Sequence, residues 1–339
     1  MRVLVTGSSG WLGRFLVPAL TGAGHQVVGL DPAAGTHTDR IGSVADRALI
    51  DRIFADQPID AVIHAGGLHK PDIVRYPRQA FIDVNITGTL NLLEAAVAHG
   101  ASRFVFTSTT SLMISHAIRA GEGEAAVWID ERMTALAPRN IYGVTKLAAE
   151  RLCRLIHDET GLPILVLRPS RFFPEDDDTH QLLSGENMKA NELMHRRLTV
   201  EDVVAAHLAA LERAPAIGFD TLILSAPTPF ARDEAAALKR DAAAVIATHF
   251  PQAAAIYTAR GWTLPASIDR VYDSGRAERV LGFRGATDFA AVLHALEDNA
   301  RLPFAHDADY TSPLAKPLRH PGLDPGFRVT GGAPGYPGS

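Results

Sequence analysis

A tyrosine and a lysine four residues apart are the side chains of this sequence best suited to proton transfer. At this spacing two residues share one face of a helix, which places the Tyr142 phenol beside the Lys146 ammonium. A phenol has a reference pKa of about 10, and a neighbouring positive charge favours its ionised form. Tyr142 is therefore a candidate general base for a substrate hydroxyl. Ordinary helix-surface chemistry produces the same spacing, so the pair alone does not define a site.

A glycine-rich turn near the amino terminus suggests an anionic cofactor. Residues 2–6 are apolar and typical of a strand, and Gly7, Gly10 and Gly13 then lead into a helical stretch. Backbone N–H groups point outward at such a turn, and the helix dipole favours negative charge there. Gly7 permits the turn, Gly10 allows a pyrophosphate to approach, and Gly13 allows close helix packing. An ordinary βα turn is the alternative, because the spacing differs from the commonest dinucleotide fingerprint.

An acidic residue ends the next apolar segment. Asp31 follows a strand expected over residues 26–30, at about the distance from the glycine turn where a carboxylate binds a ribose. It would accept hydrogen bonds from the adenosine 2′-hydroxyl and repel a 2′-phosphate, which favours NAD over NADP. A loop-capping aspartate is the alternative. The positive nicotinamide of oxidised NAD would add to the ammonium in favouring the Tyr142 phenolate.

Alternating strands and helices are expected to position these residues. Strands are predicted at 61–64, 103–106, 164–167 and 221–224, and helices at 46–55, 79–99, 141–160 and 199–213. The alternation predicts a parallel sheet with helices on both faces, and right-handed crossovers bring the strand ends to one edge. Ligands bind at that edge in this architecture. The positions at or just past the strand ends are Gly7, Asp31, Ala65, Thr109 and Pro169.

The later sequence is less regular. Residues 170–197 are polar and irregular, and we interpret the acidic run at 175–178 as a solvated loop and not a metal site. Residues 227–302 are alanine-rich and mainly helical. The basic residues at 171 and 195–197 are candidates for binding a substrate phosphate or carboxylate. The alternative is that they are solvated or paired with the acidic run.

Together the motifs resemble those of the extended short-chain dehydrogenase/reductase family, also called the NAD-dependent epimerase/dehydratase family, over roughly residues 1–302. The resemblance implies an α/β fold, with a Rossmann-type doubly wound parallel sheet and a smaller, mainly helical substrate lobe. The motifs that carry it are Gly7-x2-Gly10-x2-Gly13, Asp31, His64-Ala-Gly-Gly67, Asn85, Thr107-Ser-Thr109, Tyr142-x3-Lys146, Leu167-Arg-Pro169, Val200-x-Asp202 and Leu281-Gly-Phe283.

The resemblance also implies roles for individual residues. Thr109, Tyr142 and Lys146 are expected to be catalytic, with Ser108 as the alternative to Thr109. The expected cofactor-binding residues are Gly7, Gly10, Trp11, Leu12, Gly13, Asp31, Ser43, Val44, Ala65, Gly66, Gly67, Asn85, Tyr142, Lys146 and Pro169. The substrate candidates are His69, Lys70, Arg171 and Arg197. No metal site is expected, because the histidines show no metal-ligand spacing.

The expected activity is NAD-dependent hydride transfer at a secondary alcohol carbon of a sugar-like substrate. A nucleotide-sugar 4-epimerase, which forms a transient ketone, needs the same residues. Accumulation of NADH distinguishes the dehydrogenase from the epimerase. A non-catalytic NAD-binding sensor is the alternative from another class, although such relatives commonly lack the tyrosine or the lysine.

Composition restricts location and partners. The 339 residues are 47% hydrophobic and carry a formal net charge of −5, which gives no reason to expect a nucleic acid partner. No apolar run is long enough to span a bilayer and no signal peptide is visible, so a cytoplasmic protein is expected. The single cysteine, Cys153, excludes an internal disulfide and is expected to pack as a small hydrophobe.

The same sequence predicts how the chain is divided. We expect an NAD-binding domain at 1–169, to which 199–225 return, and a substrate lobe at 170–198 and 226–305. Residues 306–339, rich in proline and glycine, are expected to have no fold of their own. By resemblance to the family, a homodimer is expected to form through the helices at 79–99 and 141–160.

Overall fold

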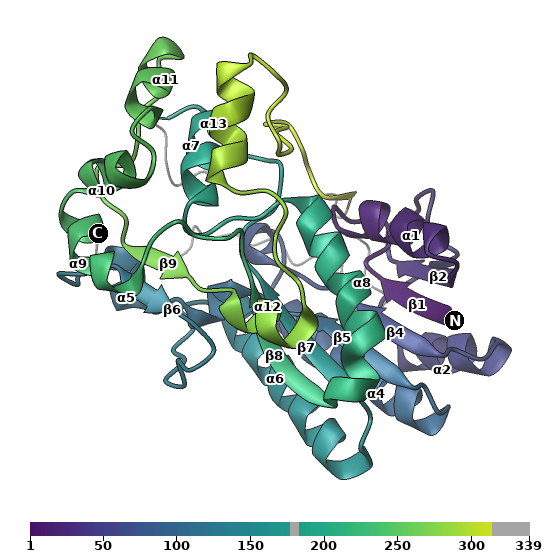
Figure 1. Cartoon of the computed structure of the whole chain (residues 1–339). Coiled ribbons are helices and arrows are strands. Elements are labelled where there is room, and N and C mark those ends of the chain that lie inside the picture. The colour runs from purple at the N-terminus through teal and green to yellow at the C-terminus, as the bar shows by residue number, and fades with distance from the viewer. Residues whose placement is uncertain (177–182, 314–339) are drawn as a thin grey trace.

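The computed structural model describes residues 1–176 and 183–313 (Figure 1). Over these ranges seven strands form a parallel sheet in the order β3-β2-β1-β4-β5-β7-β8. The chain runs outward from β1 to one side and then returns to build the other, which confirms the doubly wound α/β fold. The strands are β1 (Arg2–Thr6), β2 (Gln26–Asp31), β3 (Arg40–Ile41), β4 (Ala61–His64), β5 (Arg103–Thr107), β7 (Ile164–Pro169) and β8 (Phe219–Leu224).

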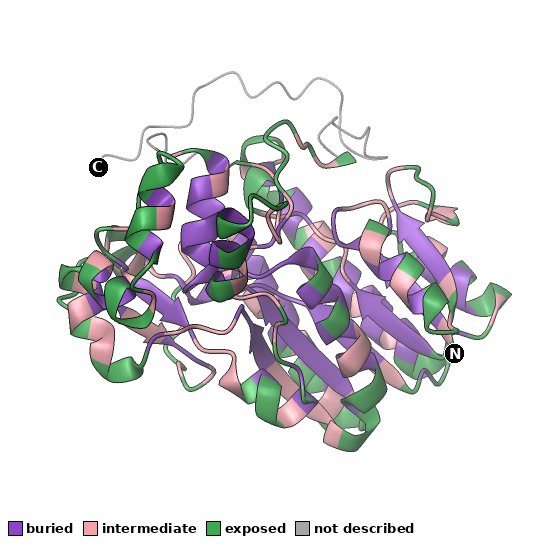
Figure 2. Ribbon diagram, turned by 45° about the horizontal axis from the view of Figure 1, so that its top comes forward, coloured by how far each residue is buried: buried purple, intermediate pink, exposed green. Residues whose placement is uncertain are grey.

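Helices cover both faces of this sheet. Val3 and Val5 of β1 belong to one buried cluster, whereas Leu4 belongs to another. Successive side chains of a strand point to opposite faces, so the two clusters are the two sides of the sheet. In Figure 2 the strands are buried along most of their length and the exposed residues lie on the outer helix surfaces. The covering helices are α1 (Gly13–Gly22) and α8 (Val200–Ile217) on one face, and α2 (Arg47–Asp56), α4 (Gly88–Ala98) and α6 (Ile141–Thr160) on the other.

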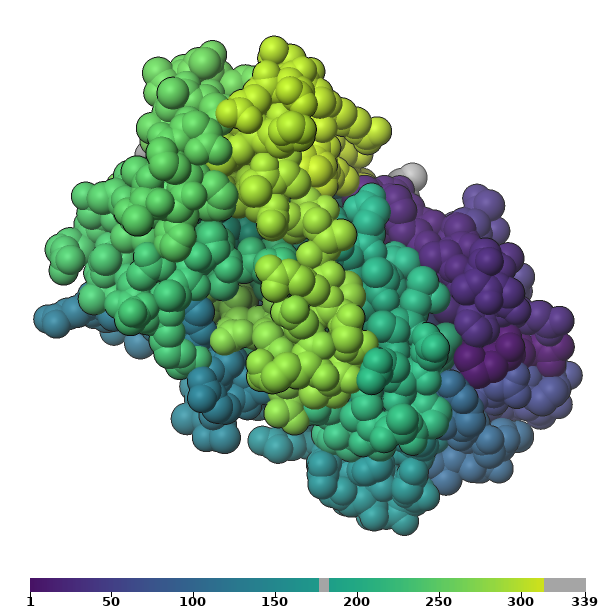
Figure 3. All heavy atoms as spheres, in the orientation of Figure 1, coloured from purple at the N-terminus to yellow at the C-terminus, as the bar shows by residue number. Residues whose placement is uncertain are grey.

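A group of shorter elements follows β8 and packs beside the sheet. The green and yellow atoms of these segments gather on one side in Figure 3, and the purple atoms of the first elements of the chain lie on the other. A small second sheet pairs β6 with β9 in parallel. The other elements are η1 (Lys70–Val74), α3 (Arg78–Phe81), η2 (Ile82–Thr87), η3 (Thr110–Met113), α5 (His116–Ala120), β6 (Val127–Ile129), α7 (Gly185–Leu193), η4 (Arg232–Glu234), α9 (Ala235–Arg240), α10 (Ala242–His249), α11 (Ala253–Ala259), β9 (Arg270–Tyr272), α12 (Gly275–Leu281) and α13 (Phe289–Glu297).

The predicted helix over residues 79–99 is interrupted. Its middle, η2, is a π-helix between α3 and α4. A π segment inserts an extra residue into the helical ladder and is frequent at functional sites. Here it contains Asn85, which is buried. The sequence pattern also missed β3, β6 and β9, which are two or three residues long and too short to show periodicity.

The expectation that residues 170–197 are irregular is wrong at α7, which is a helix over Gly185–Leu193. Ser184 caps this helix, because its side chain accepts a hydrogen bond from the Asn187 amide at 3.2 Å. Asn187 and Asn191 of α7 are buried, and both donate to the distant Thr263 carbonyl, at 3.0 and 2.9 Å. Tertiary contacts therefore hold these two side chains in the interior.

The described part of the segment at 306–339 packs against the rest of the chain. The Tyr310 ring lies 5.1 Å from the Trp11 ring, and the Arg14 guanidinium lies 5.2 Å from the Tyr310 ring centre. We predicted that this segment has no fold of its own, but most of it, residues 314–339, lies outside the described residues. Asp177 and Asp178 of the acidic run also lie outside them. The division into two domains stays a prediction. In residues 1–176 and 183–313, no helix is long and apolar enough to cross a membrane.

Candidate active site

A cavity of about 820 Å³ is bounded by the turns that follow β1, β2, β4, β5 and β7. The crevice beside β1 is where the strand order reverses, and this is where ligands bind in doubly wound sheets. The predicted site residues that line it are Gly7, Gly10, Trp11, Leu12, Asp31, Ser43, Val44, Ala65, Gly66, Gly67, His69, Lys70, Thr109, Tyr142, Lys146, Pro169 and Arg171. Gly13, Asn85 and Arg197 are not among the lining residues.

The glycine turn after β1 is built from backbone in close contact. Gly7 has a φ of +76°, and a Cβ added to it would lie 2.8 Å from the Gly66 Cα. A Cβ added to Gly13 would lie 2.1 Å from the Gly7 carbonyl oxygen. Any side chain at these positions would therefore force the turns after β1 and β4 or the start of α1 apart. The result is a cradle of main chain at a helix N-terminus, which fits the pyrophosphate of a dinucleotide.

Asp31 lies at the end of β2, on the cavity wall. Its carboxylate accepts hydrogen bonds from the Ser9 and Ala33 amides at 3.1 and 2.8 Å. Burial raises its pKa, and these two bonds counteract that effect. Nearby, Asn91 of α4 donates to the Val44 carbonyl at 3.0 Å and fixes the loop that carries Ser43 and Val44, two of the expected cofactor-binding residues. These residues lie where a ribose and an adenine would be held, and their roles remain part of the proposal below.

Asn85 holds the backbone that follows the second glycine turn. Its side-chain oxygen accepts from the Leu68 amide at 2.9 Å, and its nitrogen donates to the Leu68 carbonyl at 2.9 Å. The same nitrogen donates to the Thr145 hydroxyl on α6 at 3.0 Å. The π turn thereby connects the glycine turn to the helix that carries Tyr142. Asn85 acts behind the cavity wall, which explains why it does not line the cavity.

A buried chain of hydrogen bonds that the sequence analysis did not identify supports the same turn. The Gly66 amide donates to the Thr6 hydroxyl at 3.0 Å, and this hydroxyl lies 2.7 Å from His64 Nδ1. His64 Nε2 lies 3.1 Å from the Thr89 hydroxyl, which donates to the Asn85 carbonyl at 2.7 Å. Burial holds the pKa of His64 well below its usual range, so the imidazole is neutral. The polar residue His64 at the end of an otherwise apolar strand is the sequence feature that could have indicated this chain of hydrogen bonds.

Tyr142 and Thr109 meet at the cavity. The Thr109 side chain accepts from the Ser111 amide at 3.0 Å, and its hydroxyl is close enough to the Tyr142 phenol to favour a lower pKa there. Burial nevertheless raises the pKa of Tyr142 to about 12. The expectation of an acidic phenol is therefore wrong for the protein alone, because burial disfavours the phenolate.

Lys146 is buried one helical turn along α6 from Tyr142. Its Nζ donates to the Thr107 carbonyl at 2.8 Å and lies 4.5 Å from the centre of the Phe106 ring. Burial lowers the pKa of Lys146 to about 8. A Cβ added to Gly67 would lie 3.5 Å from this Nζ, so the ammonium also borders the second glycine turn.

Ser108 lies next to Thr109 but has a different partner. Its hydroxyl donates to Glu150 Oε1 at 2.5 Å, and Arg168 binds the same carboxylate through two bonds of 2.9 and 2.6 Å. The Ser108 hydroxyl is thus bonded to the buried Glu150–Arg168 ion pair. Thr109 is therefore the better placed of the two hydroxyls to meet a substrate.

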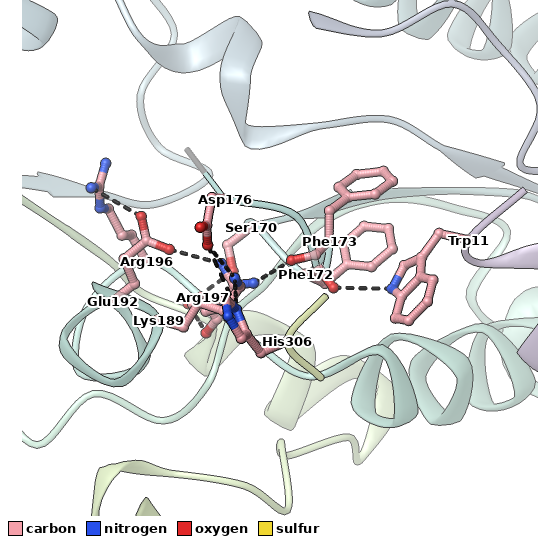
Figure 4. A network of polar contacts seen from close by, with 11 residues as sticks. Trp11, Ser170, Phe172, Phe173, Asp176, Lys189, Glu192, Arg196, Arg197 and His306 are labelled. Atoms are coloured by element: carbon pink, nitrogen blue, oxygen red, sulfur yellow. Dashed lines mark hydrogen bonds and ion pairs between the residues drawn. The ribbon is translucent and has the colours of Figure 1, made fainter. Parts of the chain in front are cut away.

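The substrate candidates fall into two groups. His69, Lys70 and Arg171 line the cavity, and the His69 ring stacks on Phe173 at 5.3 Å. Arg197 is buried away from the cavity, and its assignment as a substrate ligand is wrong. Figure 4 shows Glu192 between Arg196 and Arg197.

The contacts of Arg197 explain this correction. Its Nη1 donates to Glu192 Oε2 at 2.8 Å, and its Nη2 donates to the Phe173 carbonyl. The ion-pair partner of Arg197 among the described residues is thus Glu192 of α7. The surrounding arginines hold the pKa of Glu192 at about 2 despite its burial, so the carboxylate is charged. Among the described residues, no group of three His, Cys, Asp or Glu side chains is placed to hold a metal ion.

The fold and the cavity define a dinucleotide-binding protein of the Rossmann type. A family model described as "NAD dependent epimerase/dehydratase family" matches residues 3–218. The chain belongs to this family. The cofactor named in that description agrees with the backbone cradle and with Asp31 at the end of β2.

Individual relatives differ in what they do. Residues of UDP-glucose 4-epimerase 4 from Oryza sativa subsp. japonica are 29% identical over 201 positions, covering 51% of this chain and 52% of that protein. The chain spans about half the length of the 4-epimerases that it matches. Uronate dehydrogenase from Pseudomonas putida is 26% identical over 261 positions, covering 68% of this chain and 91% of that enzyme.

A solved structure shows the same fold. A short-chain dehydrogenase/reductase superfamily protein from Agrobacterium tumefaciens, with bound NAD, superposes with a TM-score of 0.61 at 24% identity. The superposition covers 88% of this chain and 96% of that one.

Proposed function

We propose that the protein is an NAD-dependent oxidoreductase that transfers hydride at a secondary alcohol carbon of a sugar-like substrate. The observation that carries the proposal is that Thr109 and Tyr142 line one cavity, which is continuous with the backbone cradle at Gly7. Gly7, Gly10, Gly13 and Asp31 would hold the dinucleotide. When bound, NAD supplies the hydride acceptor.

The chain's own groups then handle the proton. The Thr109 hydroxyl would hold the substrate oxygen, and the Tyr142 phenolate would take its proton as the carbinol carbon loses hydride and becomes a ketone. Because the pKa of Tyr142 is about 12 in the protein alone, ionisation at neutral pH requires more positive charge than Lys146 provides. The proposal therefore requires that oxidised dinucleotide binding lowers the pKa of this phenol.

Replacement of the phenol hydroxyl tests the proposal. We expect Tyr142→Phe to lower kcat by about a hundredfold or more, the usual contribution of a positioned general base, with little change in the Kd for NAD. Tyr257→Phe is the matched control, because Tyr257 is also buried but does not line the cavity. Turnover is followed as NADH absorbance over a panel of sugars and sugar acids. Near-normal turnover by Tyr142→Phe would remove Tyr142 from the mechanism.

A nucleotide-sugar 4-epimerase is the second candidate, because several relatives are named UDP-glucose 4-epimerases. It uses the same hydroxyl, phenol and ammonium, but the ketone is reduced again before release. An epimerase converts UDP-glucose without net NADH, whereas a dehydrogenase accumulates NADH. Binding of NAD with no turnover of any of these substrates would instead favour a non-catalytic sensor.

We also propose a homodimer in the cytoplasm. Val97 on α4 and both Val144 and Leu155 on α6 are exposed hydrophobic side chains on the two helices predicted to pair. Burial of such residues stabilises an interface. Light scattering that gives a monomer mass at working concentration would contradict the dimer, and cell fractionation tests the location.

A further inference from the structure

Two arginines lie at the substrate end of the cavity on segments that are tied together. Arg270 is in β9, and Arg196 follows α7; both line the cavity. The Tyr272 amide donates to the His195 carbonyl at 2.8 Å, and His195 Nδ1 donates to the Arg270 carbonyl at 2.9 Å. These bonds fix the two guanidinium-bearing segments side by side.

The charges in this region do not balance. Arg196 and Arg197 share the Glu192 carboxylate, with ion-pair distances of 3.0 and 2.8 Å. Arg270 pairs with Asp269 at 2.9 Å. Within this set of ion pairs, three guanidinium groups share two carboxylates, so these five side chains together carry a net charge of +1.

The arginine side chains also keep unused hydrogen-bonding capacity. Arg196 and Arg270 are 14% and 7% exposed, yet each lines the cavity. The Nε groups of both are buried and have no hydrogen-bond partner in the structure. A buried charge without full pairing is costly, so this end of the cavity favours an anion that neutralises the surplus.

We propose that Arg196 and Arg270 form a subsite for a carboxylate of the substrate, so that the enzyme acts on a sugar acid. The inference rests on the proposed function and identifies its substrate class. A carboxylate brings one negative charge, which matches the one surplus positive charge, and its two oxygens fit guanidinium forks. Tyr272, two residues along β9 from Arg270, lines the same end of the cavity.

Binding to the NADH-loaded protein tests the subsite without turnover. The probes are D-glucuronate and D-galacturonate, the neutral sugars D-glucose and D-galactose, and D-glucose 6-phosphate, each titrated calorimetrically. We expect at least one hexuronate to bind ten times more tightly than its neutral counterpart and than the phosphate. Equal or weaker binding of both hexuronates, or preference for the phosphate, would overturn the proposal with no variant needed.

Variants then identify the residues. Arg196→Gln and Arg270→Gln are each expected to weaken hexuronate binding about thirtyfold, the usual size for a charge-assisted hydrogen bond, with the Kd for NADH unchanged. Arg276→Gln is the matched control, because this arginine pairs with Asp220 on the surface and does not line the cavity. Unchanged NADH binding shows that a variant is folded, and unchanged hexuronate binding in a folded variant would overturn the assignment.

The proposed function and this inference can fail separately. Arginine-dependent hexuronate binding with no NADH formed from oxidised NAD would contradict the dehydrogenase and keep the subsite. NADH formation from a neutral sugar that is insensitive to both variants would keep the dehydrogenase and refute the subsite.

Discussion

Replacement of Lys146 by methionine should stabilise the protein at neutral pH while removing its activity. The lysine is buried and its pKa is lowered from the ordinary 10.5 to about 8, because folding removes the ammonium from water. A shift of that size corresponds to about 3 kcal/mol of unfavourable free energy at pH 7. Loss of the 2.8 Å bond to the Thr107 carbonyl offsets about 1 kcal/mol of this. The net expected gain of the Lys146→Met variant is about 2 kcal/mol.

The gain in stability of the Lys146→Met variant should depend on pH, because the protonation of the wild-type lysine does. Below pH 8 both the folded and unfolded lysine carry a proton, so the full penalty applies. Between pH 8 and 10.5 only the unfolded lysine stays protonated, and the stability of the wild-type protein rises with pH. At pH 10.5 the penalty is nearly gone and only the lost bond remains, so the variant should be equal to or slightly less stable than wild type.

Urea unfolding of dinucleotide-free protein at pH 7 and pH 10.5 measures this difference. Lys239→Met is the matched control, because Lys239 also donates to a carbonyl, that of Gly121 at 2.8 Å, but from a partly exposed position. It should show no pH-dependent gain. The reasoning is refuted if Lys146→Met is no more stable than wild type at pH 7, or if its gain persists at pH 10.5.

Three further predictions concern the cofactor end of the site and the cysteine. Asp31→Asn removes a charged acceptor, so it should raise the Kd for NAD about thirtyfold and reduce the preference of the protein for NAD over NADP. Trp11 lies on the cavity wall, and quenching of its fluorescence measures the Kd values for NAD and for NADP. Asn85→Ala leaves the Leu68 amide and carbonyl unpaired and should cost about 2–3 kcal/mol in urea unfolding; an unchanged midpoint would contradict this. Cys153 is fully buried and burial raises its pKa, so a thiol reagent should react only after unfolding.

Many residues of the candidate active site at the edge of the sheet could be predicted, because their sequence patterns are local. The glycine spacing after residue 6, the acidic residue at the end of β2 and the hydroxyls after β5 each follow a buried strand, and parallel topology brings strand ends together. The helix at Ile141–Thr160 has the predicted bounds, because Asn140 caps its start and Gly161 ends it.

The region around α7 could not be predicted in the same way, because its residues contact partners that are distant in the sequence. Polar residues at 187–192 indicate a solvated segment by composition, yet Thr263 accepts hydrogen bonds from Asn187 and Asn191. The Lys189 ammonium lies 2.7 Å from His306 Nδ1, over a hundred residues away in sequence. The raised pKa of Tyr142 has the same origin, since desolvation depends on everything packed around the phenol.

The first three of the five successive hydroxyl residues at 107–111 have different surroundings. Side chains alternate across a strand, so Thr107 bonds to His207 of α8 at 2.8 Å on one face, and Ser108 bonds to Glu150 of α6 on the other. Thr109 is the second residue past the strand, and its side chain is left at the cavity near Tyr142. The partners on α8 and α6 occupy the first two hydroxyls, which is why the proposed substrate contact falls to Thr109.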